Sequence, residues 1–360
     1  MAIVGGGPAG LATAICASLR GLSTIVLERR SCPPDKACGE GIMPAGVRAL
    51  QEMGALPHIK QADSAPFIGI RYVQEDGSAA EGRLPRGGGL GVRRTALSAA
   101  LSARAAECGV ELRWDCTARR FRRTAQGVSV ELDGGEVEAG VLVAADGLNS
   151  PLRAAEGLER PSSGPKRFGL RQHFRVAPWN NFVEVHFGAG IEAYVTPSGA
   201  ARVGIAFLWE RGANEGGASI DAFLARFPVL ASRVACSERD SEPRGAGPMP
   251  RLAAARVKDR FVLIGDAAGY VDPITGEGTS LAFACSRTLG EILPAALKRG
   301  ATVEALRPYE RAFARKFRRY ALVARAVLAL ARRPRLRCRV VRFMGAHPRV
   351  FETLVAWGVS

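Results

Sequence analysis

The chain has 360 residues, of which 47% are hydrophobic and 23% charged, and its formal net charge is +16. This composition is typical of a globular protein with a large core and excludes a disordered chain. The sequence has no run of 18 apolar residues that would form a transmembrane helix, and no basic segment of a signal peptide precedes its first turn. Eight scattered cysteines without a CxxC pair, and four histidines without metal-ligand spacing, predict no metal site and a reducing cytoplasm.

The first 28 residues predict a βαβ unit. An apolar strand over residues 2–4 runs into a glycine-rich turn, a helix follows over residues 11–19, and a second strand over residues 23–27 ends at Glu28. Short apolar strands that alternate with a helix are typical of a parallel sheet covered by helices.

The turn has the form Gly5-x-Gly7-x-x-Gly10. Gly5 allows the tight turn, Gly7 has no side chain to block a pyrophosphate, and Gly10 lets the helix pack closely on the strand. The N–H groups at the helix start would bind the phosphates. Glu28 lies 18 residues after Gly10, where an acid accepts hydrogen bonds from an adenosine ribose. The unit predicts a dinucleotide site, and the alternative is a structural turn between two core strands.

Between residues 31 and 150 strands and helices continue to alternate. The predicted elements are a close turn at Cys38-Gly39-Glu40-Gly41, a helix over 45–53, a strand over 68–74 with a hairpin turn at Asp76-Gly77, a helix after Arg94, a small sheet of residues 110–114, 128–132 and 137–138, and a buried strand over 141–145.

From residue 161 the pattern changes to a run of strands joined by Gly/Pro turns, which predicts an antiparallel sheet. A Pro/Gly/Ser-rich linker over 161–165 comes first. The elements expected after it are strands over 168–176, 182–187, 193–196 and 202–208, a short helix over 220–227 and a turn-rich segment over 243–250.

Two further strand ends carry an aspartate beside a glycine. Asp146-Gly147 follows the strand over 141–145, and Gly265-Asp266 follows a strand over 261–264. A carboxylate there can bind a ribityl hydroxyl. The N–H groups of residues 276–279, which open a helix running to residue 289, can bind the pyrimidine edge of a flavin. Each pair alone is typical of a turn, but their order and strand context favour FAD.

The sequence therefore predicts an α/β fold with a Rossmann-like FAD-binding domain in two segments, residues 1–160 and 243–300. An antiparallel β-sheet substrate domain is inserted at residues 161–242, with residues 60–90 contributing. Residues 301–360 are expected to form a basic helical C-terminal region.

The ordered motifs resemble those of the flavin-dependent aromatic hydroxylase superfamily, which shares its fold with para-hydroxybenzoate hydroxylase, and within it the branch of the geranylgeranyl reductases. The resemblance covers residues 2 to about 290. It implies that Glu28 holds the adenosine ribose, that Arg94 rather than Arg93 lies near the pyrophosphate, and that Asp266 lies near the ribityl chain. The FAD contacts that it implies are Gly5, Gly7, Pro8, Ala9, Gly10, Glu28, Arg29, Cys38, Gly39, Arg94, Asp146, Gly265, Asp266, Gly276, Glu277, Gly278 and Thr279.

Two reactions fit this resemblance. The first is hydroxylation of a hydrophobic, aromatic or polyketide-like small molecule through a flavin C4a-hydroperoxide, which needs few catalytic side chains. The alternative is reduction of a C=C bond in a prenyl chain, which the Cys38 turn favours, whereas the segment from Tyr194 to Pro197 is more similar to the hydroxylases. Pro178-Trp179 does not match the Trp-x-Trp-x-Ile-Pro segment of flavin halogenases. A flavoprotein that binds a membrane or partner with little turnover is a third alternative.

Cys38 and Tyr194 are the candidate catalytic residues. Cys38 would face the substrate, or would be a small buried residue; Tyr194 would bind a substrate oxygen, or would be a sheet tyrosine. His173 and His186 fall on predicted strands of the same sheet, as substrate-facing or structural residues. No second Rossmann unit for NADPH is present, so the resemblance implies that NAD(P)H visits transiently or that a reduced partner donates electrons.

The C-terminal region is strongly basic. Residues 311–349 contain twelve arginines and one lysine and no acid. Apolar residues from Phe313 to Ala331 recur at steps of three and four, with Arg311, Arg315, Arg318 and Arg325 on another face, which predicts an amphipathic helix. The helix could contact an anionic membrane or pack on the flavin domain with its arginines solvated. A nucleic-acid patch is disfavoured because no groove-reading element accompanies it.

Overall fold

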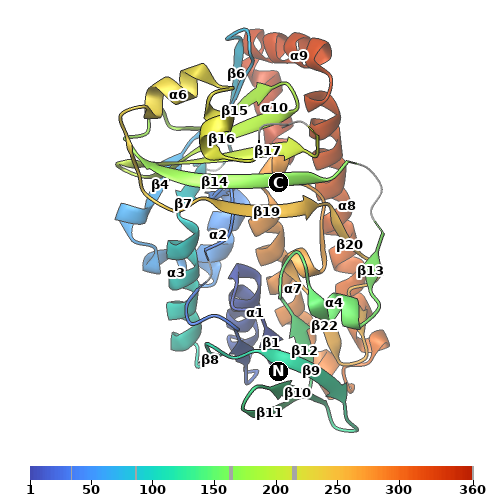
Figure 1. Cartoon of the computed structure of the whole chain (residues 1–360). Coiled ribbons are helices and arrows are strands. Elements are labelled where there is room, and N and C mark those ends of the chain that lie inside the picture. The colour runs from blue at the N-terminus through green and yellow to red at the C-terminus, as the bar shows by residue number, and fades with distance from the viewer. Residues whose placement is uncertain (34, 86, 162–164, 213–216, 359–360) are drawn as a thin grey trace.

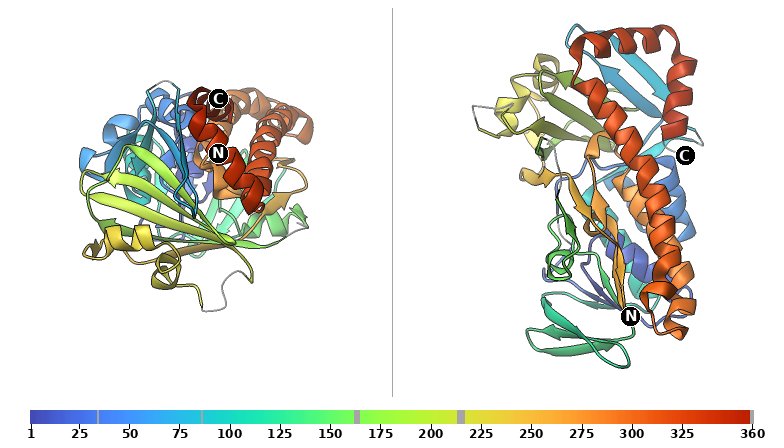
Figure 2. Two further views of the ribbon diagram at one scale, coloured as in Figure 1. Left: turned by 90° about the horizontal axis from the view of Figure 1, so that it is seen from above. Right: turned by 90° about the vertical axis from the view of Figure 1, so that its right-hand side faces the viewer.

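The computed structural model describes residues 1–33, 35–85, 87–161, 165–212 and 217–358 (Figure 1). Two halves are stacked along the long axis of the molecule, and one long helix runs beside both of them (Figure 2). Of the linker expected at residues 161–165, residues 162–164 lie outside the described residues.

The first half is built on a six-stranded sheet of order β21-β22-β12-β1-β2-β8. All neighbours are parallel except β21 and β22, and the central position Ile3 lies between Val26 and Val143, all three of them buried. Buried, β-branched strands are what a sheet covered on both faces requires. The strands are β1 (Ala2–Val4), β2 (Ile25–Leu27), β8 (Glu111–Arg113), β12 (Leu142–Ala144), β21 (Val257–Lys258) and β22 (Phe261–Leu263).

The prediction that residues 110–114 belong to a small separate sheet is wrong. β8 pairs with β2 in the parallel sheet, whereas β9 (Ala118–Arg123), β10 (Val128–Leu132) and β11 (Gly135–Ala139) form a sheet of their own. Leu112 packs on the main core between two exposed neighbours, so a single inward residue gave too weak a pattern to show which sheet the strand joins.

Helices cover the parallel sheet. α1 (Pro8–Ser18) begins with a proline at its first turn and is buried along nearly its whole length, between α3 (Arg94–Glu107) and α7 (Gly278–Lys298). Nearby lie α2 (Pro44–Glu52), α4 (Pro151–Ala155) and the short turns η1 (Leu56–His58), η2 (Gln61–Asp63), η3 (Gly265–Ala267) and η4 (Pro273–Thr275). Two small sheets join the halves: β3 (Gly41–Ile42), β7 (Gly89–Val92) and β4 (Ser64–Phe67), and β13 (Glu159–Arg160), β20 (Arg251–Ala253) and β23 (Gly269–Tyr270).

The second half is an eight-stranded sheet of order β18-β14-β17-β16-β15-β5-β6, with β19 also paired to β14. β15 pairs in parallel with β5, so residues from the 60–90 segment extend the sheet. Its strands are β5 (Gly69–Val73), β6 (Ala79–Arg83), β14 (Arg167–Arg175), β15 (Phe182–Gly188), β16 (Ile191–Gly199), β17 (Arg202–Glu210), β18 (Glu238–Arg239) and β19 (Arg244–Met249).

Two local predictions in this half are wrong. The segment expected to be turns at 243–250 contains β19, so the sheet continues past residue 242. The single helix expected over 220–227 is two helices, α5 (Ile220–Leu224) and α6 (Pro228–Val234). They are separated because a residue that precedes a proline, here Phe227, avoids the helical conformation.

Three helices form the C-terminal region: α8 (Val303–Ala331), α9 (Pro334–Ala346) and α10 (Pro348–Gly358). α8 packs its apolar face against α7, whereas α9 and α10 contact β6 of the second half (Figure 2). No helix within the described ranges is long and apolar enough to cross a membrane.

Candidate active site

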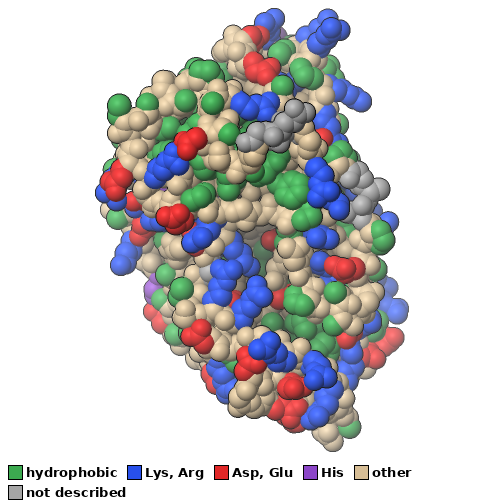
Figure 3. All heavy atoms as spheres, in the orientation of Figure 1, with side chains coloured by type: hydrophobic (Ala, Val, Ile, Leu, Met, Phe, Trp, Pro, Cys, Tyr) green, Lys and Arg blue, Asp and Glu red, His purple; other side chains and the backbone are tan. Residues whose placement is uncertain are grey.

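A cavity of about 470 Å³ lies between the two halves of the molecule. It begins at Gly7 of the glycine turn, passes the Cys38 turn and the loop before α7, and ends among residues of β15, β16 and the three C-terminal helices. On the face shown in Figure 3, a hollow between the halves has lysine and arginine side chains on its rim. The cavity thus connects the glycine turn, the Cys38 turn and the loop before α7 to the C-terminal region.

The glycine turn has the geometry that a pyrophosphate requires. A Cβ on Gly10 would lie 1.9 Å from the carbonyl oxygen of Gly5, and a Cβ on Gly5 would lie 2.4 Å from that of Ala145. Both positions therefore exclude any side chain. Gly7 instead faces open space, with Arg94 Nη2 as its nearest neighbour at 3.9 Å. Backbone N–H groups at the start of α1 are left accessible to an anion beside this arginine.

Glu28 ends β2 and is buried. Its Oε2 accepts a hydrogen bond from the Gly6 N–H at 2.7 Å, and its Oε1 accepts one from the Arg30 N–H at 3.2 Å. The acid thus also fixes the glycine turn. Arg29 is exposed and does not line the cavity, so its role at the cofactor stays a prediction.

The groove between the strand ends contains polar atoms without protein partners. Arg94 Nε and Asp146 Oδ1 are buried and make no hydrogen bond with a described residue, although Asp146 Oδ2 accepts one from the Leu152 N–H at 3.2 Å. Arg94 lines the cavity but Asp146 does not, so the contact of Asp146 with the cofactor stays a prediction. Asp266 lies in the cavity wall, where burial raises the pKa of its carboxyl. Lys36 lies opposite, and burial, with a further effect of Arg94, lowers the pKa of its ammonium group. Cations near the glycine turn and acids farther along fit the pyrophosphate and ribityl hydroxyls of FAD.

Arg93 and Arg94 point to different surroundings, and the role of Arg94 at the pyrophosphate stays a prediction. Arg93 turns away from the cavity and donates to the Asp240 carbonyl at 3.1 Å, whereas Arg94 lines the cavity beside Gly7. Lys36 was missed by the sequence reasoning, because a single lysine two residues before Cys38 has no distinctive pattern.

The Cys38 turn is held by Glu40. Glu40 has a φ of 59°, a left-handed conformation that is costly for a residue with a side chain. Its carboxylate accepts a hydrogen bond from the Arg94 N–H at 2.8 Å, and its Oε2 lies 2.5 Å from His173 Nε2, within hydrogen-bond distance. Thr196 adds a bond from its hydroxyl to the Gly39 carbonyl at 2.7 Å. The turn is therefore attached to both halves.

His173 is completely buried and structural. Its Nδ1 lies 2.8 Å from Ser241 Oγ and 3.1 Å from Arg171 Nη1, and Arg171 also pairs with Asp35 ahead of the turn. His186 pairs with Glu184 at 2.9 Å and does not line the cavity. Within the residues that the structure describes, no group of three or more His, Cys, Asp or Glu side chains could hold a metal ion.

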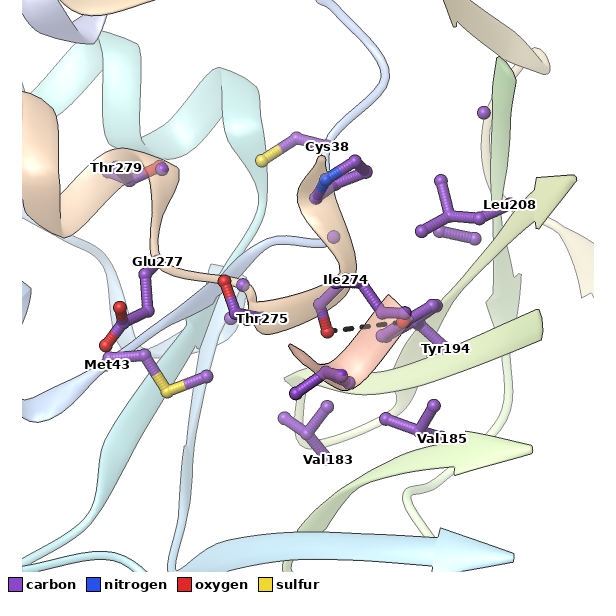
Figure 4. A pocket seen from close by; sticks show the side chains of 18 of the residues that line it. Cys38, Met43, Val183, Val185, Tyr194, Leu208, Ile274, Thr275, Glu277 and Thr279 are labelled. Carbon is purple, nitrogen blue, oxygen red and sulfur yellow. Dashed lines mark hydrogen bonds between the residues drawn. The ribbon is translucent and has the colours of Figure 1, made fainter. Parts of the chain in front are cut away.

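Cys38 itself lines the cavity and is half-buried, and its Sγ accepts a hydrogen bond from the Glu40 N–H at 3.4 Å. In Figure 4 the sulfur points into the space on the side of Thr279. The position places a thiol beside the residues expected to hold the flavin, and its catalytic role stays a prediction.

The loop before α7 is fixed by buried charges from the second half. Arg167 pairs with Glu192 at 2.6 Å and with Asp272 at 2.9 Å. Burial raises the pKa of Asp272 to about 6 despite this arginine. Tyr320 of α8 donates to the Asp272 carbonyl at 2.7 Å, which also ties the long helix to the loop.

Tyr194 lies where the sheet meets this loop. Its hydroxyl donates to the Ile274 carbonyl at 3.3 Å, and its ring lines the cavity (Figure 4). Burial raises its pKa well above the usual value, so the phenol is a poor acid here. The tyrosine packs the loop onto the sheet, and its role toward a substrate stays a prediction.

Glu277 is the N-cap residue of α7 and lines the cavity. In Figure 4 its carboxylate points away from Cys38 toward Met43. Burial raises its pKa to about 7, and Arg319 of α8 opposes this shift.

The far part of the cavity is mostly apolar, although the buried Arg337 also lines it. Its walls come from the second sheet and from the C-terminal helices, and its mouth includes Leu354 and Trp357, which are 49% and 55% exposed. The sequence reasoning did not assign α8–α10 to the site. The apolar lining residues include Ile70, Tyr72, Val183, Val185, Phe187, Val327, Leu330, Val341, Met344, Phe351 and Val355.

Comparison with known proteins gives one family match over most of the chain. Residues 1–324 match the family described as FAD binding domain. The digeranylgeranylglycerophospholipid reductase 1 of Methanopyrus kandleri is 28% identical over 377 aligned positions, which cover 99% of this chain and 96% of that protein. The menaquinone reductase of Mycobacterium tuberculosis is 27% identical over 321 positions, covering 81% of this chain and 75% of the relative.

Solved structures share the fold. A flavoprotein/dehydrogenase from Cytophaga hutchinsonii superposes with a TM-score of 0.82 at 20% identity, covering 99% of this chain and 92% of that one. The halogenase PltM in complex with phloroglucinol and FAD superposes with a TM-score of 0.76 at 18% identity, covering 86% and 72%. At these identities the likeness is one of fold.

Proposed function

The chain belongs to the FAD binding domain family and is an FAD-dependent oxidoreductase, and from this premise we propose that it reduces a C=C bond in a long, prenyl-like chain. The observation that carries the proposal is the apolar extension of the cavity between the second sheet and α8–α10. A cavity of this form suits a flexible hydrophobic chain better than a single aromatic ring. The names of the reductase relatives also support a hydrophobic substrate.

The bound cofactor would supply an electron pair to the substrate, and the chain's own residues hold and shield it. Gly7, Lys36 and Arg94 would bind the pyrophosphate, with Asp266 at the ribityl chain. The apolar walls exclude water, and Cys38 stands where the substrate chain would pass the flavin. We propose NAD(P)H or a reduced partner protein as the electron donor.

Hydroxylation is the second candidate. The burial of Tyr194 in the cavity wall supports it, because an oxygenase must mainly exclude water and orient its substrate. Hydroxylation was the first expectation from the sequence, and the extent of the cavity supports proposing reduction first here.

The reactions are separated by reducing the FAD-loaded protein without oxygen and adding a phospholipid with geranylgeranyl chains in micelles. We expect substrate-dependent reoxidation of the flavin without oxygen, and a product heavier by two hydrogens for each saturated bond. Reoxidation only when oxygen is admitted, with a product that gains an oxygen atom, supports hydroxylation. Tight FAD binding with no substrate-dependent reoxidation under either condition contradicts both.

A matched variant tests the cavity assignment. Val185→Phe places a ring in the apolar wall without touching the residues expected to hold FAD. We expect it to lower kcat/KM for the long chain by about tenfold, with a smaller loss for a ten-carbon prenyl alcohol. Equal losses for both chain lengths contradict a long-chain site.

We further propose a peripheral contact between α8–α10 and an anionic membrane. Among the described residues, six of the eight large hydrophobic side chains that are exposed lie on these helices, including Leu322, Phe343 and Trp357. Arg318, Arg325 and Arg339 are exposed beside them and make no ion pair with any described residue. Arginines around exposed aromatic and aliphatic residues suit the interface of an anionic bilayer. The surface adjoins the cavity mouth at Trp357.

Vesicle flotation tests this contact. We expect the protein to float with vesicles that contain phosphatidylglycerol and not with pure phosphatidylcholine, and to be released by salt. Phe343→Ser should weaken binding, whereas Val229→Ser, an exposed apolar residue on α6, should not. Binding that is absent from both kinds of vesicle contradicts the proposal.

A further inference from the structure

Two glutamates, Glu40 and Glu277, occupy glycine turns beside the expected flavin, and their carboxylates differ in their hydrogen-bond partners. Glu40 accepts hydrogen bonds from Arg94 N–H and is paired with His173. The carboxylate of Glu277, between Gly276 and Gly278, makes no hydrogen bond or ion pair with any residue in the described part of the chain, although the backbone carbonyl accepts one from the Leu281 N–H at 2.9 Å. Glu40 is therefore explained by the turn that it holds, whereas Glu277 is not.

The surroundings of Glu277 disfavour its charged form. Met43 of the segment before α2 lies beside it in Figure 4 and carries no charge. Arg319 of α8 is the one cation whose field acts on it, and that guanidinium donates to the Trp357 carbonyl. Burial outweighs this field and raises the pKa of Glu277 to about 7. The other titratable side chains of the cavity wall are Lys36, Cys38, Glu40, Tyr72, Arg94, Arg171, Tyr194, Asp266, Tyr270 and Arg337.

We propose that Glu277 takes up a proton when the bound FAD is reduced. Its backbone belongs to the segment of residues 276–279 whose N–H groups open α7 and are expected to face the flavin. Reduction adds negative charge to the flavin, and a negative charge near an unpaired carboxylate favours the protonated form of that carboxyl group. The inference rests on FAD binding and not on the choice between reduction and hydroxylation.

The step balances in charge and atoms. A reduced nicotinamide, or dithionite in the experiment, delivers two electrons to the flavin and is itself oxidised. A proton from solvent forms an O–H bond at the Glu277 carboxylate. When the electron pair passes on to an acceptor, that O–H bond breaks and the proton leaves with it or returns to solvent.

The first test is the pH dependence of the flavin midpoint potential in the FAD-loaded protein and in Glu277→Gln. One additional proton changes a two-electron equilibrium tenfold per pH unit, which is about 30 mV. Below pH 7 Glu277 is already protonated, so the two slopes should agree. Above pH 7 the midpoint potential of the wild-type protein should fall more steeply than that of the variant. The difference in slope should be about 30 mV per pH unit over the pH range in which reduction of the flavin protonates the carboxylate.

Glu291→Gln is the matched control, because Glu291 lies on the same helix but is exposed and pairs with Arg20. Its slope should follow the wild-type protein. Identical slopes for the wild-type protein and Glu277→Gln at every pH would overturn the proposal.

A second measurement needs no variant. The infrared difference spectrum between reduced and oxidised wild-type protein at pH 8 should show a new protonated carboxyl band. Glu277→Gln should lose this band, and Glu291→Gln should keep it. A spectrum of the wild-type protein without any carboxyl signal contradicts proton uptake, even if the variant does not fold. Because neither experiment uses a substrate, failure here is distinct from failure of the proposed reaction.

Discussion

The two halves of the molecule use their residues in opposite ways. The flavin half places short backbone segments with little side-chain bulk, Gly5 to Gly10 and Gly276 to Thr279, against the space expected for the cofactor. The second half presents apolar side chains such as Val183, Val185 and Phe187 from a broad sheet. Recognition by backbone demands exact sequence positions, whereas an apolar wall tolerates many sequences of similar volume.

The join between the halves is polar and buried. Glu40 with His173, and Asp272 with Arg167, connect the two flavin-facing loops to the sheet. Removing one partner of a buried ion pair strongly destabilises the folded protein, because the other charge is left buried without a partner or water. A substitution in the cavity wall of one half should therefore affect that half alone. A substitution in the ion pairs that connect the halves should affect both.

The largest effect is expected from breaking the flavin half at its glycine turn. Gly10→Val would drive side-chain atoms into the Gly5 carbonyl, since even a Cβ would lie 1.9 Å from that oxygen. We expect loss of bound FAD and a fall of about 3 kcal/mol or more in the free energy of unfolding. Flavin absorbance of the purified protein and urea unfolding measure both.

The control for that variant is Gly134→Ala in the turn between β10 and β11, where a Cβ would meet nothing within 4 Å. It should retain FAD and change stability by less than about 0.5 kcal/mol. Retention of FAD by Gly10→Val would show that the turn does not approach the cofactor.

The next largest effect is expected at the join. His173→Asn removes the partner of the buried Glu40 carboxylate and should destabilise the protein by about 3 kcal/mol. Because Glu40 holds the Cys38 turn in a left-handed conformation, we also expect weaker FAD binding and faster alkylation of Cys38 by iodoacetamide.

His186→Asn is matched to this change, since it breaks a buried pair with Glu184 away from the cavity. It should lower stability without altering FAD affinity or Cys38 alkylation. If both variants change the rate of Cys38 alkylation equally, the pair of Glu40 and His173 does not position the Cys38 turn.

A smaller effect concerns pH. The Glu277 pKa is raised from 4.5 to about 7, so the folded apoprotein binds this proton more tightly than the unfolded chain. The contribution of Glu277 to stability is therefore highest below about pH 4.5, and it falls as pH rises to 7. The loss is at most on the order of 3 kcal/mol. Comparing urea unfolding of apo wild-type protein and Glu277→Gln between pH 4.5 and 8 measures it; a constant difference across this range contradicts the raised pKa.

The smallest effect is expected on the outer face of α8. Arg318→Gln and Arg325→Gln together should change stability by less than about 0.5 kcal/mol, because both side chains are exposed. Vesicle binding should fall with FAD binding unchanged. A large loss of stability would show that these arginines support the fold.

The sequence alone predicted most of the flavin half, because its constraints are local. A glycine is required where a Cβ has no room, and buried parallel strands are continuous apolar runs, as at 142–144 and 261–263. FAD as cofactor, the α/β class and the oxidoreductase family followed from the order of these motifs and are confirmed by the family match. Five strands of the second half, β5 and β14–β17, were also predicted to within three residues at their ends, whereas β6, β18 and β19 were not.

What the sequence could not determine depends on residues that meet from distant parts of the chain. Nothing near Glu40 indicates that His173 is its partner, and nothing near Glu277 indicates that it has none among the described residues. β8 pairs with β2 in the larger sheet, although only one of its residues faces the core. The helices α9 and α10 reach the cavity because they pack against β6. Local spacing determined the cofactor site, whereas tertiary packing decided which buried charges are paired and how far the apolar cavity extends.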